Sequence, residues 1–549
     1  MTAGYLIKNY VRDIKREFAG YSAANFRQDA LAGATVAAVA LPLALAFGVG
    51  SGADAAAGLI SAIVSAFVIG TLSGASFQIS GPTGAMTAIL IPLSIKFGIS
   101  GVLAAGFISG ILLTAAGLCK AGRLVNLIPV SVITGFTSGI AIIIALGQLE
   151  SFLGVSSQGS GTLIRVWNIF ARGFNPNPYA VATGLAVIGL ILLWPARWAS
   201  VIPGSLVSIV LAAELSSALD LPLATVGQIP VKLIHDAHLS FETFHLAFSE
   251  PMLLAGTSIA ALGMVESLLC GVAGGRMKGE KLDVDRELVA QGIGNMLLPF
   301  LGGVPATAAI ARSSVAIRSG GRTRMTGAVQ GAILLLSMFL LAPFMSKIPL
   351  AALAGVLMVT AWRMNEWHTI RYIFARKFRM AELKFLITLS ATVFFDLTVA
   401  IAAGVFFAIA VFVFNVANLV ITVHEADSRL FPAGSGDKEH ARIVSVTGPM
   451  FFAAMERFET AVHQIKADIL VFSMGGVPYI DASGAHQLRN FCKARKDRGE
   501  TILFASLHPG VKEFLDQAGI VEIVGRDAFF DSVPAALGSV GKKTELSSD

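Results

Sequence analysis

Charge divides this chain of 549 residues into two regions of different character. Residues 1–424 contain 27 basic and 18 acidic residues, whereas the much shorter stretch 425–549 contains 14 basic and 17 acidic residues. Globular proteins carry about 25% charged residues, so only the second region has an ordinary soluble composition. The first region has the composition of a membrane domain. A wholly soluble protein of this length is therefore excluded.

Apolar stretches that are separated by polar, Gly or Pro residues predict the membrane spans. A helical span needs about 20 predominantly apolar residues. Such stretches are centred near residues 40, 62, 88, 110, 138, 187, 208, 262, 292, 310, 335, 355, 390 and 412. The stretches near 88 and 310 are short or broken, so the predicted number of spans is twelve to fourteen. An even number places both termini on the same side of the membrane.

The distribution of Lys and Arg tests this prediction, because cytoplasmic loops are enriched in positive charge. With fourteen spans and a cytoplasmic N-terminus, 21 basic residues of the first region fall on the inside. Those that fall outside are Lys96, Arg165, Arg172, Lys232 and Lys347, and Arg312 lies within an apolar segment. The pattern fits fourteen spans with both termini in the cytoplasm.

The membrane region also contains an internal repeat. Residues 32–52 match residues 255–275 without a gap, and the same offset of 223 aligns Pro82 with Pro305. A third pair, 128–135 and 348–355, needs a shift of three residues. Two halves of seven spans have opposite orientations, which is the inverted repeat of many secondary transporters.

Pro82 and Pro305 predict two helices that begin inside the membrane. Proline suits the first turn of a helix, and glycines beside both prolines permit an irregular backbone before it. Two facing helix N-termini would present N–H groups and positive dipole ends to one point, which should bind an anion. The alternative is that both motifs are kinks in packed helices.

Two charged residues lie within apolar segments. Glu266 has about ten uncharged residues on each side, and charges at such depth rarely face lipid. Because burial disfavours a charged carboxylate, Glu266 is predicted to carry a proton; a structural role and a Na⁺ site are the alternatives. Arg312 lies about two helical turns beyond Pro305 and would hold the anion or neutralise Glu266.

Motifs of catalysis and cofactor binding are missing from the sequence. It contains no G-x-x-x-x-G-K-[ST], no G-x-S-x-G and no H-E-x-x-H motif, and its histidines and cysteines form no metal-like cluster. We therefore expect no enzyme activity, no metal site, no cofactor and no nucleic-acid partner. Transport would have to use ion gradients.

The second region predicts a small α/β domain. Four short β-like runs, RIVSVT, DILVFSM, TILFASL and VEIVG, alternate with helical patterns over 452–466, 483–498 and 510–518. The turn Asp481-Ala482-Ser483-Gly484 opens the second of these helices. Asp and Ser are ordinary N-cap residues, and phosphorylation of Ser483 is the alternative role, because a phosphate is favoured at a helix N-terminus.

Several motifs resemble the sulfate permease (SulP) family of anion transporters with a C-terminal STAS domain. They are SGPTGA at 80–85, the stretch GNMLLPFLGGVPATAAIARSSVAIRSGGRT, and GPMFFAAMERFE followed by VPYIDASG. The combination VESLLCGV, ATAAIARS and GPMFFAA is most similar to the bacterial branch that includes a C4-dicarboxylate transporter.

The resemblance implies a fold, a site and an assembly. The fold is a homodimer of fourteen-helix protomers, in which a core domain moves against a gate domain in an elevator-like motion. The implied anion site comprises Phe47, Thr83, Gly84, Ala85, Ala306, Thr307, Ala308 and Arg312. Glu266 matches the acidic residue of the eighth helix, and Ser483 matches the phosphorylatable serine of soluble STAS proteins.

Two departures from the family pattern affect the expected coupling. Leu43 stands after Pro42 where many relatives have Gln, so one polar contact is missing. Na⁺-coupled bicarbonate transporters typically have Asp followed by a hydroxyl one turn later, whereas this chain has Glu266 and Cys270. We therefore expect proton-coupled symport of a dicarboxylate such as succinate or fumarate, or of sulfate. A bicarbonate transporter, and an anion channel or exchanger, are the alternatives.

The predicted domain organisation follows from these patterns. The ranges are an N-terminal cytoplasmic segment 1–25, a transport domain 26–424 with repeats at about 26–218 and 250–424, a linker 425–440, a STAS domain 441–540 and a tail 541–549. The expected location is the cell inner membrane, and the expected partners are a small anion, protons, lipid, a second copy and a cytoplasmic regulator of the STAS domain.

Overall fold

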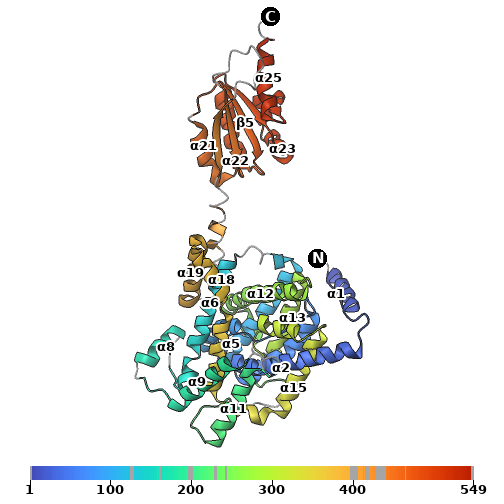
Figure 1. Cartoon of the computed structure of the whole chain (residues 1–549), viewed down its shortest axis with the longest axis vertical. Helices are drawn as coiled ribbons and strands as arrows, with labels where there is room; N and C mark the ends of the chain where they lie inside the picture. The colour runs from blue at the N-terminus through green and yellow to red at the C-terminus, as the bar shows by residue number, and fades with distance from the viewer. Residues whose placement is uncertain are drawn as a thin grey trace. The chain divides into compact units, whose positions relative to one another are not determined.

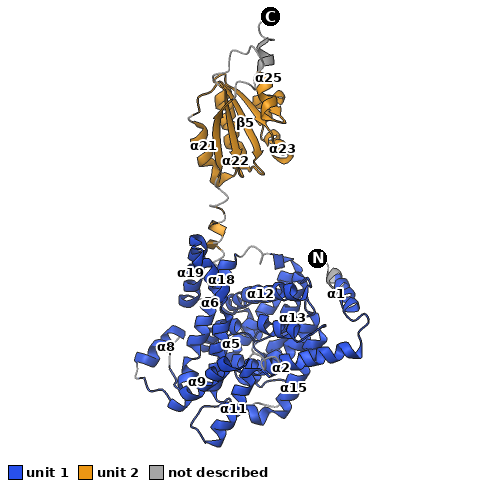
Figure 2. Ribbon diagram, in the orientation of Figure 1, with its two compact units in different colours: residues 1–405 blue, residues 406–549 orange. Residues whose placement is uncertain are grey.

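A computed structural model of the chain describes most of its residues (Figure 1). The described residues are 3–123, 129–157, 159, 162–171, 174–195, 202–227, 232–240, 244–395, 419–426, 441–463 and 465–545, with isolated positions between 403 and 413. They form two compact units, residues 1–405 and 406–549 (Figure 2). Each unit is described by itself.

The first half of unit 1 begins with the amphipathic helix α1 (Ala3–Glu17) and the apolar helix α2 (Ala23–Gly50). The next span consists of α3 (Ala55–Val64), a π-helical turn η1 (Ser65–Ile69) and α4 (Gly70–Leu72). The short strand β1 (Ser80–Gly81) and the long helix α5 (Gly84–Leu118) follow. The remaining helices are α6 (Val130–Gly147), α7 (Leu149–Leu153), α8 (Thr162–Ala171), α9 (Pro178–Leu193) and α11 (Gly204–Ala218).

The second half contains helices in a similar order. After the 3₁₀ turn η3 (Phe244–Phe248) come α12 (Glu250–Lys278), α13 (Val284–Leu301), the strand β2 (Thr307–Ala308) and α14 (Ile310–Arg318). The helices described after α14 are α15 (Met325–Leu340), α16 (Ala342–Met345), α17 (Leu350–Met364), α18 (Trp367–Ala375) and α19 (Arg379–Phe394). Within the described residues, a short strand therefore interrupts the helices of each half, β1 in the first and β2 in the second.

Most of the predicted spans correspond to helices. Five helical stretches among the described residues are long and apolar enough to cross a membrane: 23–50, 55–72, 84–118, 130–153 and 250–278. The range α5 covers both stretches predicted near 88 and 110, because it consists of two helical segments that meet in a kink at Gly98, whose backbone (φ 68°, ψ −172°) is not helical. The stretch predicted near 412 falls mostly outside the described residues. The count of fourteen spans remains a prediction.

Glycines allow α5 and α13 to pack closely. A Cβ atom at Gly292 would lie 2.2 Å from Thr114 Oγ1 and 2.5 Å from the Thr114 backbone nitrogen. On the facing helix, a Cβ at Gly110 would lie 2.5 Å from the Met296 backbone nitrogen. Small residues at helix interfaces are typical of membrane proteins, because close approach maximises van der Waals contact where lipid supplies no hydrophobic drive.

Unit 2 is an α/β domain built on one sheet in the order β3-β4-β5-β6-β7 (Figure 1). The strands are β3 (Val420–Glu425), β4 (Ala441–Thr447), β5 (Ile469–Gly476), β6 (Thr501–Ala505) and β7 (Phe529–Phe530). β3 is antiparallel to β4, and the other neighbouring strands are parallel. The helices are α21 (Met455–His463), α22 (Ala482–Lys496), α23 (Pro509–Gln517), α24 (Ile520–Val524) and α25 (Val533–Glu545).

Two sequence predictions for this region need correction. The run VEIVG was predicted as a strand, but Ile520–Val524 form α24, which packs its buried residues Ile520 and Val524 into the core. A short apolar run does not distinguish a strand from a buried helix by its periodicity. The sheet also begins earlier than predicted, because β3 starts at Val420, within the range assigned to the membrane domain.

We expect Gly292→Ala to destabilise the transport unit, since an added methyl group must displace the Thr114 backbone. Overpacking of this kind costs about 1–3 kcal/mol. The measurement is the thermal unfolding temperature of the purified protein in detergent. Gly189→Ala in α9 is the matched control, because nothing lies within 4 Å of a Cβ at that position. Equal unfolding temperatures for the two variants would contradict the packing argument.

Candidate functional site

Two short strands from opposite halves of the repeat pair inside the helical core. β1 and β2 are antiparallel, with Ser80 opposite Ala308 and Gly81 opposite Thr307. All four residues are buried. A helix begins soon after each strand: α5 starts at Gly84 and α14 starts at Ile310. The pair therefore brings two helix N-termini to one place, as the repeat predicted.

The position of Pro305 differs from the prediction. The structure places Pro305 before β2, so α14 begins five residues after it, whereas α5 begins two residues after Pro82. The expectation that Pro305 opens a helix is wrong, because residues 306–308 are extended and hydrogen-bonded. Arg312 consequently lies in the first turn of α14, closer to the helix N-terminus than the sequence indicated.

Polar side chains from α12 and α13 hold the second strand. Asn295 donates to the carbonyl of Ala306 and accepts from its N–H, both at 2.8 Å. Ser267 lies 2.6 Å from Thr307 Oγ1 and accepts from the N–H of Ala308 at 3.3 Å. The N–H groups of Ala306 and Ala308 thus already have acceptors. Residues 306–308 are all fully buried. Residues 306–308 therefore form the scaffold of the site in this conformation.

The first turn of α14 is more accessible than β2. Ile310 is 45% exposed and Ala311 is also exposed, whereas Thr307 and Ala308 are fully buried. The first N–H groups of a helix have no acceptor within that helix. The N–H of Ala309 is bonded to the carbonyl of Ile79 at 2.9 Å, so the backbone N–H groups of Ile310 and Ala311 are better placed than residues 306–308 to offer donors to an anion. The sequence analysis missed these residues because it took Pro305 as the helix start.

Thr83 connects the first helix N-terminus to Glu266. Its side chain caps α5 by accepting from the N–H of Met86 at 3.4 Å, and it donates to Glu266 Oε2 at 3.0 Å. Glu266 is half-buried in the middle of α12. A hydroxyl group that donates to the carboxylate stabilises its charged form, and this bond would change when the carboxylate takes a proton.

Arg312 supplies a buried cation beside the same segment. Its side chain is almost fully buried, and Nη2 donates to the carbonyl of Pro82 at 3.0 Å. Among the described residues, none is a hydrogen-bond partner of Nη1. A Cβ atom on Gly81 would lie only 2.5 Å from Nη1, so a glycine is needed there. Arg312 and Glu266 form no direct ion pair within 4.0 Å in the described part of the chain.

The remaining predicted residues of the first half also lie at this place. Phe47 of α2 is 4% exposed, and its ring edge is 3.3 Å from the position of a Cβ on Gly84. Ala85 follows in the first turn of α5 and is buried. The structure thus brings together Phe47, Thr83–Ala85, Glu266 and Arg312 around the strand pair.

Other polar residues of the core were not singled out from the sequence. Gln291 donates to Ser80 Oγ at 2.8 Å, Gln78 donates to the carbonyl of Ser267 at 2.8 Å, and Ser313 accepts from the N–H of Ile79 at 2.9 Å. Gln291, Ser267 and Ser313 lie in helices of the second half and bind residues next to or within β1. The sequence signal that could have identified Ser267, Gln291 and Ser313 is the presence of a polar residue within an apolar helix.

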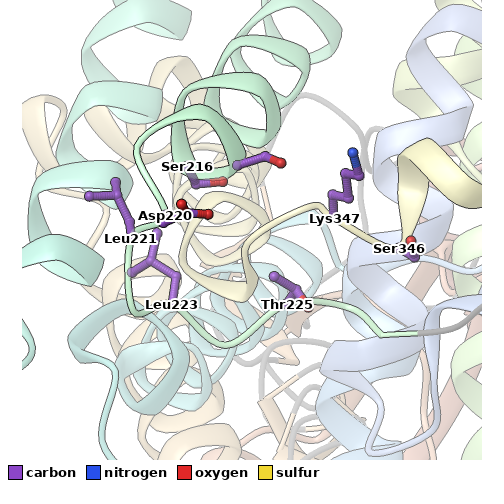
Figure 3. Close-up of a pocket in the computed structure, with 8 residues that line it drawn as sticks. Ser216, Asp220, Leu221, Leu223, Thr225, Ser346 and Lys347 are labelled. Atoms are coloured by element: carbon purple, nitrogen blue, oxygen red, sulfur yellow. The ribbon is translucent and has the colours of Figure 1, made fainter.

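A surface cavity of about 300 Å³ lies elsewhere, at the end of α11 (Figure 3). It is lined by Ser216, Ser217, Asp220, Leu221, Leu223, Thr225, Ser346 and Lys347. None of these residues belongs to the strand-pair site. The converging helix N-termini and the buried arginine, not this cavity, identify the candidate site.

Ser483 lies at the start of α22 in unit 2 and is exposed. The helix is capped by Asp481, whose Oδ1 accepts from the N–H of Gly484 at 2.7 Å. The other carboxylate oxygen accepts from the N–H of Phe452 at 3.1 Å. Asp481 therefore performs the capping role, and the hydroxyl group of Ser483 is not needed for it.

Comparison with known proteins assigns both units. Residues 26–391 match the model of the sulfate permease family, and residues 437–536 match that of the STAS domain. The "Putative sulfate transporter YvdB" of Bacillus subtilis is 33% identical over 94% of this chain and 98% of that protein. The transmembrane domain of a cyanobacterial bicarbonate transporter, BicA, is 31% identical, covers 69% of this chain and 97% of that chain, and has a TM-score of 0.63.

A third comparison supports the fold of the whole chain. The structure of SLC26A9 covers 100% of this chain and 96% of that chain, with a TM-score of 0.85 at 16% identity. The chain therefore belongs to the sulfate permease family, a family of membrane anion transporters, and carries a C-terminal STAS domain. It is a multi-pass membrane protein.

We expect Arg312→Gln to abolish or strongly reduce anion binding, because the site loses its buried cation. The measurement is the rise in unfolding temperature that sulfate or succinate produces, since a ligand stabilises the folded state in proportion to RT ln(1 + [L]/Kd). Arg318→Gln is the matched control on the same helix, where Arg318 is exposed. An equal anion-induced shift in both variants would exclude Arg312 from the site.

Proposed function

We propose that the protein is a secondary active transporter that couples the uptake of a small anion to a proton gradient. The observation that carries the proposal is the convergence of the N-termini of α5 and α14 on a strand pair beside the buried Arg312. Helix N-termini favour anions, and an unpartnered guanidinium nitrogen adds a donor and a full positive charge.

Glu266 is the proposed proton carrier. It is the acidic side chain that contacts the first helix N-terminus, through Thr83. Bound anion and bound proton would then lie on the same small group of residues, so each would favour the other electrostatically. Such a site carries the anion and the proton together, which is symport.

The proposed substrate is a small divalent anion: sulfate, or a C4-dicarboxylate such as succinate or fumarate. Sulfate agrees with the name of the relative from Bacillus subtilis. The dicarboxylate rests on the motif resemblance of the sequence analysis. Bicarbonate is the second candidate, favoured by the likeness to BicA in both sequence and fold, with an anion channel or exchanger as the alternative mode.

The assembly and location are part of the same proposal. We propose fourteen spans in a 7+7 inverted repeat, a homodimer that works by an elevator-like motion, and an inner-membrane location with cytoplasmic termini. The STAS domain would serve as the docking site of a cytoplasmic regulator, with Ser483 as its switch, since this serine is exposed at a helix N-terminus.

We expect Glu266→Gln to bind substrate but to lose proton-driven accumulation, because the amide occupies the same volume without exchanging a proton. The measurement is uptake of labelled sulfate, succinate and bicarbonate into liposomes, with and without an inward proton gradient. The gradient should raise accumulation by the native protein and leave the variant at equilibration.

Glu250→Gln provides the control, since Glu250 lies exposed at the first position of the same helix. This variant should accumulate substrate like the native protein. Proton-driven accumulation by Glu266→Gln at the native level would remove Glu266 from the coupling mechanism. Equilibration without any response to the gradient in the native protein would favour a channel or a uniporter.

A further inference from the structure

Ser73 and Gly74 form a junction between α4 and the segment that leads to β1. The carbonyl of Ser73 accepts from Arg286 Nε at 3.1 Å and from Arg324 Nη2 at 3.0 Å. Glu287 accepts from the hydroxyl group of Ser73 at 2.6 Å and from the N–H of Gly74 at 2.8 Å. These contacts fix the start of residues 73–81, the segment that ends in β1.

The same junction leaves no room for a side chain larger than glycine. The carbonyl of Gly74 accepts from Arg286 Nη2 at 3.0 Å and from the N–H of Asp283 at 3.1 Å. A Cβ atom at Gly74 would lie 2.1 Å from the carbonyl oxygen of Asp283. Residues of the second repeat therefore supply all of these hydrogen-bond partners of Ser73 and Gly74.

The two arginines that hold Ser73 are paired with helix α1. Arg286 Nη1 lies 2.6 Å from Asp13 Oδ2, and the side chain of Arg286 is 7% exposed. Arg324 Nη1 forms an ion pair with Glu17, whose other carboxylate oxygen accepts from the Arg324 backbone N–H at 2.6 Å. Asp13 and Glu17 are the acidic residues of α1, and both are used in this way.

Helix α1 presents different charges on its two sides. Asn9, Tyr10, Asp13, Ile14 and Glu17 are half-buried and recur at the helical spacing of three and four residues. The basic residues Lys8, Arg12, Lys15 and Arg16 are exposed. The acidic side of the helix thus docks on the transport unit, while its basic side faces away.

We propose that α1 acts as a strap. By its ion pairs with Arg286 and Arg324 it holds the Ser73–Gly74 junction in place, and through the junction it positions β1 and the anion site. Asp13 and Glu17 neutralise Arg286 and Arg324, these arginines hold Ser73–Gly74, and the junction holds β1. The loss of a carboxylate would leave a buried arginine unpaired, which is costly, so the guanidinium group would turn toward water and release Ser73. The predicted loosening of β1 follows from these contacts alone. The predicted loss of anion affinity also rests on the proposed function.

A second path ties the junction to β1. Glu287 Oε1 accepts from Gln291 Nε2 at 2.8 Å, and the same Nε2 donates to Ser80 Oγ in β1 at 2.8 Å. Glu287 therefore bonds to the junction with its Oε2 atom. Its Oε1 atom bonds to Gln291, which in turn bonds to β1. A displaced junction would move Glu287 and disturb β1 by this route as well.

The double variant Asp13→Asn/Glu17→Gln tests the strap in the full-length protein. Amide hydrogen exchange of peptides covering residues 73–81 should become about tenfold faster, because local opening becomes easier. The N–H groups of Gly74, Ser76 and Ile79, which bond to side chains of the second repeat, report on this opening. The unfolding shift produced by sulfate or succinate should also decrease.

The matched control is Lys15→Gln/Arg16→Gln, which removes two charges from the exposed side of the same helix. Exchange in 73–81 that rises in the acidic variant and not in the control supports the strap. Native exchange in the acidic variant, or the same rise in both, would overturn it. If the double variant does not fold, Asp13→Asn and Glu17→Gln are measured singly. Because exchange needs no substrate, it separates failure of the strap from failure of the proposed function.

Discussion

The need to satisfy backbone polar groups inside a membrane controls the centre of this protein. Lipid offers no hydrogen-bond partners, so non-helical backbone is tolerated only where it is buried in protein. Here two segments leave the helical state, and they satisfy each other as the strand pair β1–β2. Asn295 and Ser267 supply the remaining partners of β2. Asn295 and Ser267 therefore compensate for the hydrogen bonds that the broken helix cannot supply.

The same constraint decides where an anion can bind. The N–H groups of Ala306 and Ala308 already have partners, so β2 has few donors to give. The first turns of α5 and α14 still have donors without intrahelical acceptors, and Arg312 brings a charge that its one bond to Pro82 does not neutralise. An anion would complete this group.

Sequence patterns predicted which residues meet around the strand pair but not the backbone conformation there. Charge separated the two units, and the repeat brought the motifs near Pro82 and Pro305 together. The offset of 223 could not show that residues 306–308 become a strand, because extended and helical backbone depend there on Asn295 and Ser267, which are distant in the sequence. VEIVG failed as a strand for a related reason, since its period fits both states. The Ser73–Gly74 junction depends on Arg286, Glu287 and Arg324. These residues lie far from the junction in the sequence, so no local pattern predicts the contact.

The contacts of β1 have a consequence for any motion of the core. β1 and its approach belong to the first repeat, yet Gln291, Ser313 and the arginines that hold Ser73 belong to the second. A movement of β1 alone would break bonds to three separate elements of the second repeat. A movement of β1 together with α13, α14 and the start of α15, where Arg324 lies, would break none of them. This difference favours the transport of the anion by a rigid body that includes both helix N-termini, and α1, bound to the arginines of that body, would travel with it.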